Sequence, residues 1–242
     1  MVERFFFTGK TNSQPPIQPD SVILISGPPS SGKTSLLFQF AFNSVLEKNG
    51  TVVIICNRRR LETNPPFLSQ FVPRLQFQGV DPSSDIFQHI QMKYVDDDEG
   101  IKNYFAAFHI HDIFPVSVII DNFADFFDGR NCQERYNNPR GRDLAMTRTL
   151  ALCQNAINHA KSKGPCNLLL SDTHQGDSPR LLYIYKRWIS CIYTIREGDG
   201  SGSFILKNNS DTTRAERMRT AKYSIALQYL VLEGVTEDEE QE

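Results

Sequence analysis

The segment GPPSSGKT, at residues 27–34, has glycine, lysine and threonine in the spacing of a loop that binds phosphate. Glycine at positions 27 and 32 permits backbone angles that other residues resist, so consecutive amides can surround an anion. The helix expected to begin at Lys33 adds the positive end of its dipole. Lys33 would reach the outer phosphates of a nucleotide, and the Thr34 hydroxyl would ligate Mg²⁺. The alternative is an ordinary Gly/Pro turn with an exposed lysine. The predicted nucleotide contacts are Gly27, Pro28, Pro29, Ser30, Ser31, Gly32, Lys33, Thr34 and Ser35.

A second acidic group follows the apolar run VSVIID, which ends at Asp121. A carboxylate at the tip of a buried strand beside the phosphate loop can hold the water shell of a metal ion. The sequence therefore predicts Lys33 and Asp121 as catalytic residues, Thr34 and Asp121 as metal ligands, and ATP and Mg²⁺ as cofactors. The alternative is that Asp121 simply ends a strand and begins a turn.

Hydrophobic patterning predicts the elements that would position these residues. Nearly continuous apolar runs predict buried strands, and helical spacing predicts amphipathic helices between them, as in an α/β fold with a mostly parallel sheet. Later runs joined by turns predict antiparallel C-terminal strands, with helices on both faces of the sheet. The acidic run DDDE (96–99) is interpreted as a surface turn. The predicted strands are 21–27, 51–56, 74–80, 116–121, 166–172, 187–197, 203–208 and 221–233; the predicted helices are 33–47, most of 83–111, and 143–162, with a loop at 122–142.

Composition restricts the class of protein. The chain has 242 residues, of which 40% are hydrophobic and 22% charged, as expected for one globular domain. Its net charge of -2 gives no overall basic excess, so nucleic-acid binding would need a local patch. No apolar run approaches the ~20 residues of a membrane helix. The five cysteines include no C-x-x-C pair, which argues against a zinc ribbon and favours reduced thiols in the nucleus or cytosol.

Three segments are expected along the chain. Residues 1–20 form a flexible leader rich in proline and glutamine, residues 21–233 form the ATPase domain, and residues 234–242 form an acidic disordered tail. The run FFF at positions 5–7 has two interpretations. It would either insert into a pocket of a neighbouring subunit or tuck against its own domain.

These features together resemble the RecA-type recombinases of eukaryotes and archaea and their paralogues. The resemblance covers about residues 21–233 and includes the phosphate loop, the strand ending in IID, a polar loop with arginines, the strand NLLLSDTHQ and the later segment RWISCIYTIREGDGSGSFILKN. It implies a RecA-like P-loop NTPase core. Within that group, ISGPPSSGKTSLLFQFAFN followed by VVIICNRRRLETNPP is most similar to the small paralogues that associate with a zinc-binding SWIM-domain protein in the Shu complex.

The resemblance implies a nuclear DNA-repair accessory that binds ATP and single-stranded DNA and supports recombinase filaments in homologous recombination. The implied partners are a SWIM-domain zinc protein and a recombinase or recombinase paralogues, with no membrane. Two alternatives remain open. One is an interaction scaffold that nucleotide stabilises without significant hydrolysis, and the other is a different P-loop NTPase.

The chain departs from active recombinases after its second core strand. Those enzymes carry there a glutamate that activates the attacking water, whereas this chain reads CNRRR, with Asn57 and Arg58; Glu62 lies farther on. We therefore expect ATP binding with slow or absent intrinsic hydrolysis, while weak DNA-stimulated turnover stays open.

The resemblance also places DNA and sensor residues. Gln175, at the exit of the strand NLLLSD, would sense the terminal phosphate. Two segments after the acidic strand would hold single-stranded DNA through arginine, lysine and tyrosine side chains, although solvated surface loops would have the same composition. The predicted DNA contacts are Arg130, Arg135, Arg140 and Arg142 in the first segment, and Arg180, Lys186 and Arg187 in the second.

Overall fold

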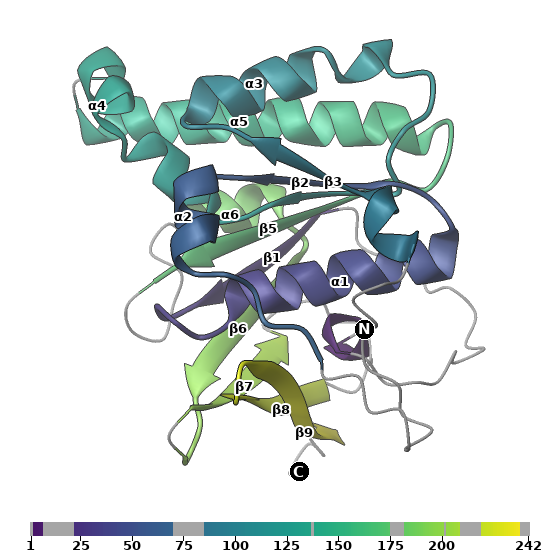
Figure 1. Ribbon diagram of the computed structural model, residues 1–242. Helices are drawn as coiled ribbons and strands as arrows, with labels where there is room; N and C mark the ends of the chain where they lie inside the picture. Colours follow the sequence, from purple (N-terminus) through teal and green to yellow (C-terminus); the bar gives the residue numbers. More distant parts are fainter. Residues whose placement is uncertain are drawn as a thin grey trace, which may run out of the picture.

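The computed structural model describes residues 2–6, 22–69, 85–136, 138–174, 182–200, 202–208 and 219–237. In these residues a nine-stranded sheet runs through the molecule in the order β3-β2-β4-β5-β1-β6-β7-β8-β9 (Figure 1). The strands are β1 (Val22–Gly27), β2 (Val52–Cys56), β3 (Ile90–Tyr94), β4 (Ser117–Ile120), β5 (Asn167–Thr173), β6 (Cys191–Glu197), β7 (Ser203–Asn208), β8 (Arg219–Ala226) and β9 (Tyr229–Glu237).

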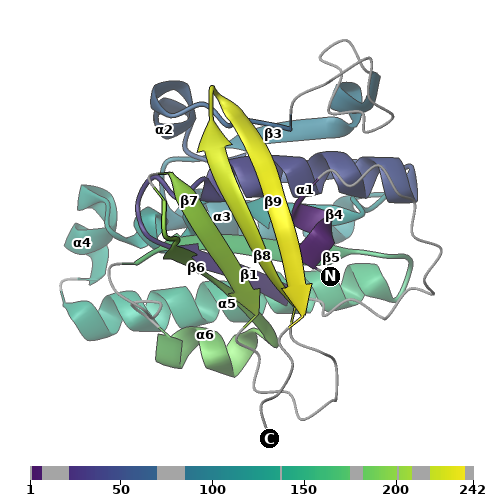
Figure 2. The ribbon, with the colours of Figure 1, turned by 90° about the horizontal axis from the view of Figure 1, so that it is seen from below.

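The sheet has a parallel part and an antiparallel part. Every pair from β3 to β6 is parallel, and β1 lies between β5 and β6. From β6 onward the chain turns back on itself, so β7, β8 and β9 form an antiparallel meander. Figure 2 shows this meander across one side of the molecule, beside α1. An α/β fold with a mostly parallel sheet and antiparallel C-terminal strands is therefore confirmed.

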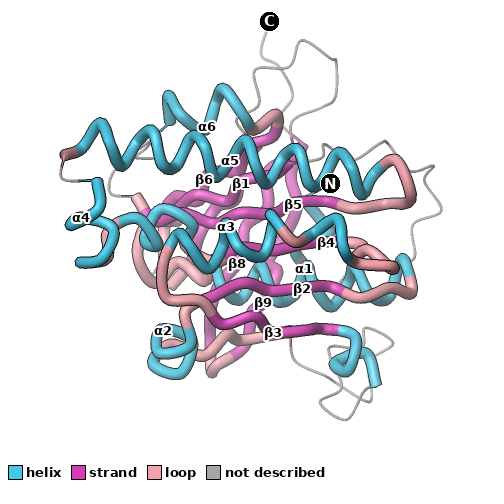
Figure 3. The backbone as a smooth tube through the Cα atoms, turned by 90° about the horizontal axis from the view of Figure 1, so that it is seen from above, coloured by secondary structure: helices cyan, strands magenta, loops and turns pink. Residues whose placement is uncertain are grey.

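Helices cover both faces of the parallel part. In Figure 1, α1 lies on one side of the sheet and α3 and α5 lie on the other; Figure 3 shows α5 beside α3 and α6. Asn138 caps the long helix α5 by accepting a hydrogen bond from the Gly141 amide, and proline occupies its first turn. The helices are α1 (Lys33–Lys48), α2 (Arg58–Thr63), α3 (Asp98–Ala106), α4 (Arg130–Tyr136), α5 (Pro139–Lys161) and α6 (Leu182–Trp188), with 3₁₀ turns η1 (Val2–Phe5), η2 (Asp85–His89), η3 (Phe108–Ile110) and η4 (Phe123–Phe127).

The core is divided by the sheet into two apolar layers. Alternate residues of β1 face opposite layers, since Leu24 packs with α3, α5 and α6 while Ile23 and Ile25 pack with α1. The central strands are buried on both faces, which explains their continuous apolar sequences. The predicted phosphate loop joins a strand and a helix that both pack into this core.

Four predicted boundaries differ from the structure. Residues 90–94 form the edge strand β3 and not a helix, and residues 123–136 contain η4 and α4 and not a continuous loop. Residues 182–188 form the helix α6, so β6 begins only at Cys191. The predicted strand 221–233 is two strands, β8 and β9, joined at Leu227 and Gln228, whose positive φ values of 50° and 64° suit a tight hairpin. The predicted strand 74–80 lies outside the described residues.

Both predicted ends also differ. Residues 234–237 belong to β9 and not to a disordered tail. Residues 2–6, assigned above to a flexible leader, pack on the domain. The Phe5 ring lies 5.4 Å from that of Phe40 and 5.2 Å from that of Tyr193, and the Phe6 ring lies 5.5 Å from that of Tyr223. Phe5 and Phe6 are therefore buried in their own chain, and the insertion of these two rings into a neighbouring subunit is not supported.

No helix in the described ranges has the combination of length and apolar character that crossing a bilayer requires.

Candidate phosphate-binding site

The predicted phosphate loop connects the end of β1 at Gly27 to the start of α1 at Lys33. Ser30 and Gly32 have positive φ values of 60° and 77°, so the chain makes a tight turn directly before the helix. Gly32 stands at the N-cap and has no side chain to occupy the amides of the first turn. The loop thus presents backbone N–H groups and the positive end of a sixteen-residue helix to any bound anion.

Both glycines of the motif are needed for packing as well as for geometry. A Cβ atom at Gly27 would lie 2.7 Å from the Cβ of Ile195 on β6. A Cβ atom at Gly32 would overlap the side chain of Ile225 on β8. Side chains of β6 and β8 therefore pack directly against the loop, and a side chain at either position would collide with them.

The Lys33 side chain is folded into the loop. Its Nζ donates hydrogen bonds to the carbonyl oxygens of Gly27 at 3.0 Å and Pro28 at 2.6 Å, and only 5% of the residue is exposed. Burial lowers the pKa of this ammonium to about 8, against the opposing charges of Asp121 and Asp172. Burying this cation costs free energy. An anionic phosphate that enters the loop would offset that cost by pairing with the ammonium.

Thr34 and Asp121 lie together, as predicted. The Thr34 hydroxyl donates a 3.0 Å hydrogen bond to one carboxylate oxygen of Asp121, and the Ser171 hydroxyl on β5 donates a 2.8 Å bond to the other. The Asn122 amide donates in turn to the Ser171 oxygen at 2.7 Å. Ser171 positions this carboxylate, and no motif identifies it, because only the pairing of β4 with β5 brings it there.

The donor set fits a magnesium nucleotide. Burial raises the pKa of Asp121, while hydrogen bonds from Ser171 and Thr34 and the charges of Arg60 and Lys33 oppose the shift. A hydroxyl and a carboxylate 3.0 Å apart are hard oxygen ligands of the type that Mg²⁺ takes beside phosphate oxygens and water. Among the described residues no group of three or more His, Cys, Asp or Glu side chains could hold a metal.

The antiparallel half also supports the loop through Tyr223. Its buried hydroxyl donates a 2.7 Å hydrogen bond to the Ser31 carbonyl oxygen, and its ring contacts Phe6. Phe6 thus packs against Tyr223, which in turn is hydrogen-bonded to the phosphate loop. No sequence motif indicates this support.

A pocket opens beside Asp121 at the carboxyl edge of β2 and β4. The side chain of Arg60, on α2, forms an ion pair with Asp125 there. From the sequence alone, the arginine run 58–60 could be a phosphate contact, a nuclear signal or a solvated helix start. Asp96 lies in the run interpreted above as a surface turn. The lining residues are Asn57, Arg60, Asp96, Asp121, Asn122, Asp125 and Phe126.

Asn57 lies between the end of β2 and the start of α2. Its side chain accepts a 3.2 Å hydrogen bond from the Arg60 amide and so caps α2. Glu62 is largely exposed and pairs with Arg58 at 2.9 Å, and it does not line the pocket. The residue that directly follows β2 is therefore a neutral amide.

The exit of β5 contributes a buried histidine that was not predicted. His174 Nδ1 lies 2.6 Å from the Ser26 hydroxyl, and its backbone amide donates to the Gly27 carbonyl at 3.1 Å. His174 thereby fixes the start of the phosphate loop to the end of β5. Gln175, the predicted phosphate sensor, lies outside the described residues.

The predicted DNA residues fall into three groups. Arg135 forms ion pairs with Asp97 and Asp98 at 3.2 and 2.6 Å and also with Glu99, and Arg142 pairs with Asp128 at 2.6 Å. These two arginines pair with carboxylates of their own chain, and their role as DNA contacts stays a prediction. The exposed group is Arg140, Lys186 and Arg187. The side chain of Arg130 and all of Arg180 lie outside what the structure describes.

Neither the family models nor the curated proteins with which the sequence was compared gave a match.

Proposed function

We propose that this protein binds ATP and Mg²⁺ through a RecA-like P-loop NTPase core. The observation that carries the proposal is the convergence of Lys33, Thr34 and Asp121 where the loop after β1 faces the end of β4. Ligands of open α/β sheets bind at the carboxyl ends of parallel strands, and all three groups lie there. The order of strands, with an antiparallel addition after β6, also suits the resemblance to recombinases.

Each residue has a defined task in this proposal. Loop amides and Lys33 bind the outer phosphates, and Thr34 with Asp121 holds the metal, which neutralises phosphate charge when bound. Ser171 orients the Asp121 carboxylate. Because Asn57 replaces the general base, the site would retain ATP and hydrolyse it slowly.

Calorimetry on the purified full-length chain tests this proposal. We expect saturable binding of MgATP at one site, weakened when EDTA removes Mg²⁺. Absence of heat and of any MgATP-dependent rise in melting temperature would contradict it, since a ligand that binds only the folded state must stabilise that state.

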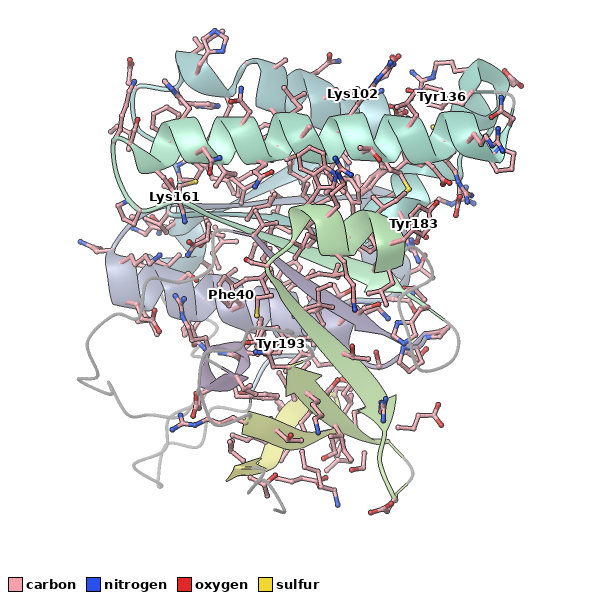
Figure 4. The ribbon with its side chains drawn as sticks, turned by 180° about the vertical axis from the view of Figure 1, so that it is seen from behind. Phe40, Lys102, Tyr136, Lys161, Tyr183 and Tyr193 are labelled. Carbon is pink, nitrogen blue, oxygen red and sulfur yellow. The ribbon has the colours of Figure 1, made fainter. Side chains whose placement is uncertain are left out.

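The recombination role is a further part of the proposal. A nuclear DNA-repair accessory with a SWIM-domain zinc protein and a recombinase as partners is what the resemblance implies, and an exposed cationic surface supports contact with single-stranded DNA. The exposed residues are Arg140 and Leu144 on α5 and Tyr183, Lys186 and Arg187 on α6, and the Tyr183 hydroxyl donates a hydrogen bond to Asp143 of α5. Figure 4 shows Tyr183 at the end of α5 opposite to Lys161. Arginine and lysine would pair phosphates, and tyrosine would stack on a base.

We expect the double variant Lys186→Ala/Arg187→Ala to bind single-stranded DNA more weakly and with a smaller salt dependence. Loss of two phosphate contacts would reduce the slope of log K against log salt by about 1.4. Fluorescence anisotropy at several salt concentrations measures that slope. The matched control is Lys161→Ala/Lys163→Ala, which removes two charges at the opposite end of α5. An unchanged slope in the first variant would show that Lys186 and Arg187 do not contact DNA phosphates.

The second candidate function is a nucleotide-stabilised scaffold for protein partners, which the neutral Asn57 favours. It differs from the first in one respect: a variant unable to bind ATP would keep its partners and its cellular role.

A further inference from the structure

Arg60 lies in the pocket beside the candidate metal ligand, although the sequence offers no motif for it. It belongs to α2, which follows β2 at the carboxyl edge of the sheet. Its side chain is 47% exposed and shares the pocket with Asp121 and Asn122. It is therefore both accessible to a ligand and directed towards the phosphate loop's side of the sheet.

Local structure separates Arg60 from the two arginines that precede it. Asn57 caps α2 through the Arg60 amide, which fixes the first turn. Arg58 is directed elsewhere, since its guanidinium pairs with Glu62 and lies 5.5 Å from the centre of the Tyr94 ring. Arg59 is exposed and does not line the pocket. Successive helical residues point about 100° apart, so one arginine of the three reaches the site.

Two acidic residues hold Arg60 in this position. Asp125, on η4, forms an ion pair with it, and Asp121 attracts it electrostatically. Among the described residues that line the pocket, Arg60 is the one that carries a positive charge, so it is the group there that can pair with phosphate oxygens.

Resting on the proposed nucleotide site, we propose that Arg60 contacts the terminal phosphate of bound ATP and makes the site select triphosphate over diphosphate. A guanidinium presents a planar fork of donors that matches phosphate oxygens, and the Asp125 pair would pre-orient that fork. Arg60 would thus stabilise bound ATP through the charge of its terminal phosphate. Asn57 supplies no general base, so the bound triphosphate would stay intact. A diphosphate lacks the group that Arg60 reaches.

The test is calorimetry on the full-length chain with two ligands, MgADP and the magnesium complex of a non-hydrolysable ATP analogue. We expect Arg60→Ala to lose about tenfold or more in affinity for the ATP analogue, the effect of one charge-assisted hydrogen bond, and to keep its affinity for MgADP within about twofold. Arg60→Gln, which keeps an amide for Asp125, should lose affinity in the same selective way. Arg59→Ala, the matched control on the same helix, should change neither affinity.

Two results would overturn the inference. One is an unchanged preference for the ATP analogue in both Arg60 variants. The other is an equal loss for both ligands, which would place Arg60 in general electrostatics or in the support of α2. Either result leaves the proposed function standing provided that the unaltered chain binds MgATP. If the unaltered chain binds neither nucleotide, the proposed function itself fails.

Discussion

Replacing Lys33 with methionine should lower the affinity for MgATP by about a hundredfold, because in the proposed site the ammonium would make charge-assisted bonds to phosphate worth about 3 kcal/mol together. Methionine keeps the buried stem and removes only the charge. The lowered pKa of Lys33 shows that folding penalises this ammonium, so we expect the unliganded variant to melt no earlier than the unaltered chain. Calorimetry and a thermal melt measure the two quantities separately.

The pH dependence of binding gives a second readout for Lys33. With a pKa of about 8 before ligand binds, the ammonium is charged at pH 7 and largely neutral at pH 9. Affinity for MgATP should therefore fall as pH rises through 8, and the methionine variant should lack that decline. Lys48→Met, at the other end of α1, serves as the control. Undiminished ATP binding by Lys33→Met would contradict the proposal that this loop binds the nucleotide.

Replacing Asp98 with alanine should reduce the free energy of unfolding by about 3 kcal/mol, the effect expected on removing one partner from a buried charge network. The carboxylate is fully buried. It accepts hydrogen bonds from Tyr136 at 2.9 Å, from Arg135 at 2.6 Å and from Lys102, and a weaker one from Cys132 at 3.4 Å. These contacts join α3 to α4, so the variant should also loosen the segment that precedes α5. Urea denaturation followed by circular dichroism measures the change.

Acid should reveal the same network. Burial alone would raise the pKa of Asp98, but the hydrogen bonds from Lys102, Tyr136 and Cys132 lower it below the ordinary value. A carboxyl group with a lowered pKa stabilises the fold fully above its unfolded pKa of about 3.9, and that contribution is lost as pH falls through the folded pKa. The alanine variant should therefore lose less stability on acidification below pH 4. Asp96→Ala, two residues away and exposed, should unfold like the unaltered chain; equal losses at both positions would refute the network's role.

The fold could be predicted from the sequence where burial decides the pattern. β1, β2, β4 and β5 lie in the sheet's interior, and their apolar runs identify them without any knowledge of neighbours. β3 could not be recognised, because it is an edge strand whose residues are mostly exposed and whose sequence IQMKY has no apolar run. The α2 cap at Asn57 likewise depends on a local hydrogen bond that spacing alone does not reveal.

The candidate site shows the same division. The loop and Asp121 could be predicted because motif and strand order coincide. The acidic run at 96–98 could not, because three adjacent aspartates have three different environments: Asp96 lines the pocket, Asp97 caps α3 and Asp98 is buried among cations. The ion pairs of the arginines in the predicted DNA loop could not be predicted for the same reason. Arg135 and Arg142 find carboxylates that only the folded arrangement of α3, η4 and α4 supplies.

The contact of Phe6 with Tyr223, and of Tyr223 with the Ser31 carbonyl, has a consequence for how the chain can be shortened or tagged. Trimming the first six residues would remove the ring behind Tyr223 and so weaken a support of the phosphate loop, although the deletion touches no loop residue. A bulky fusion at the same end would also disturb the packing of Phe6 against Tyr223. Position along the polypeptide is therefore a poor guide to which ends of this molecule are dispensable.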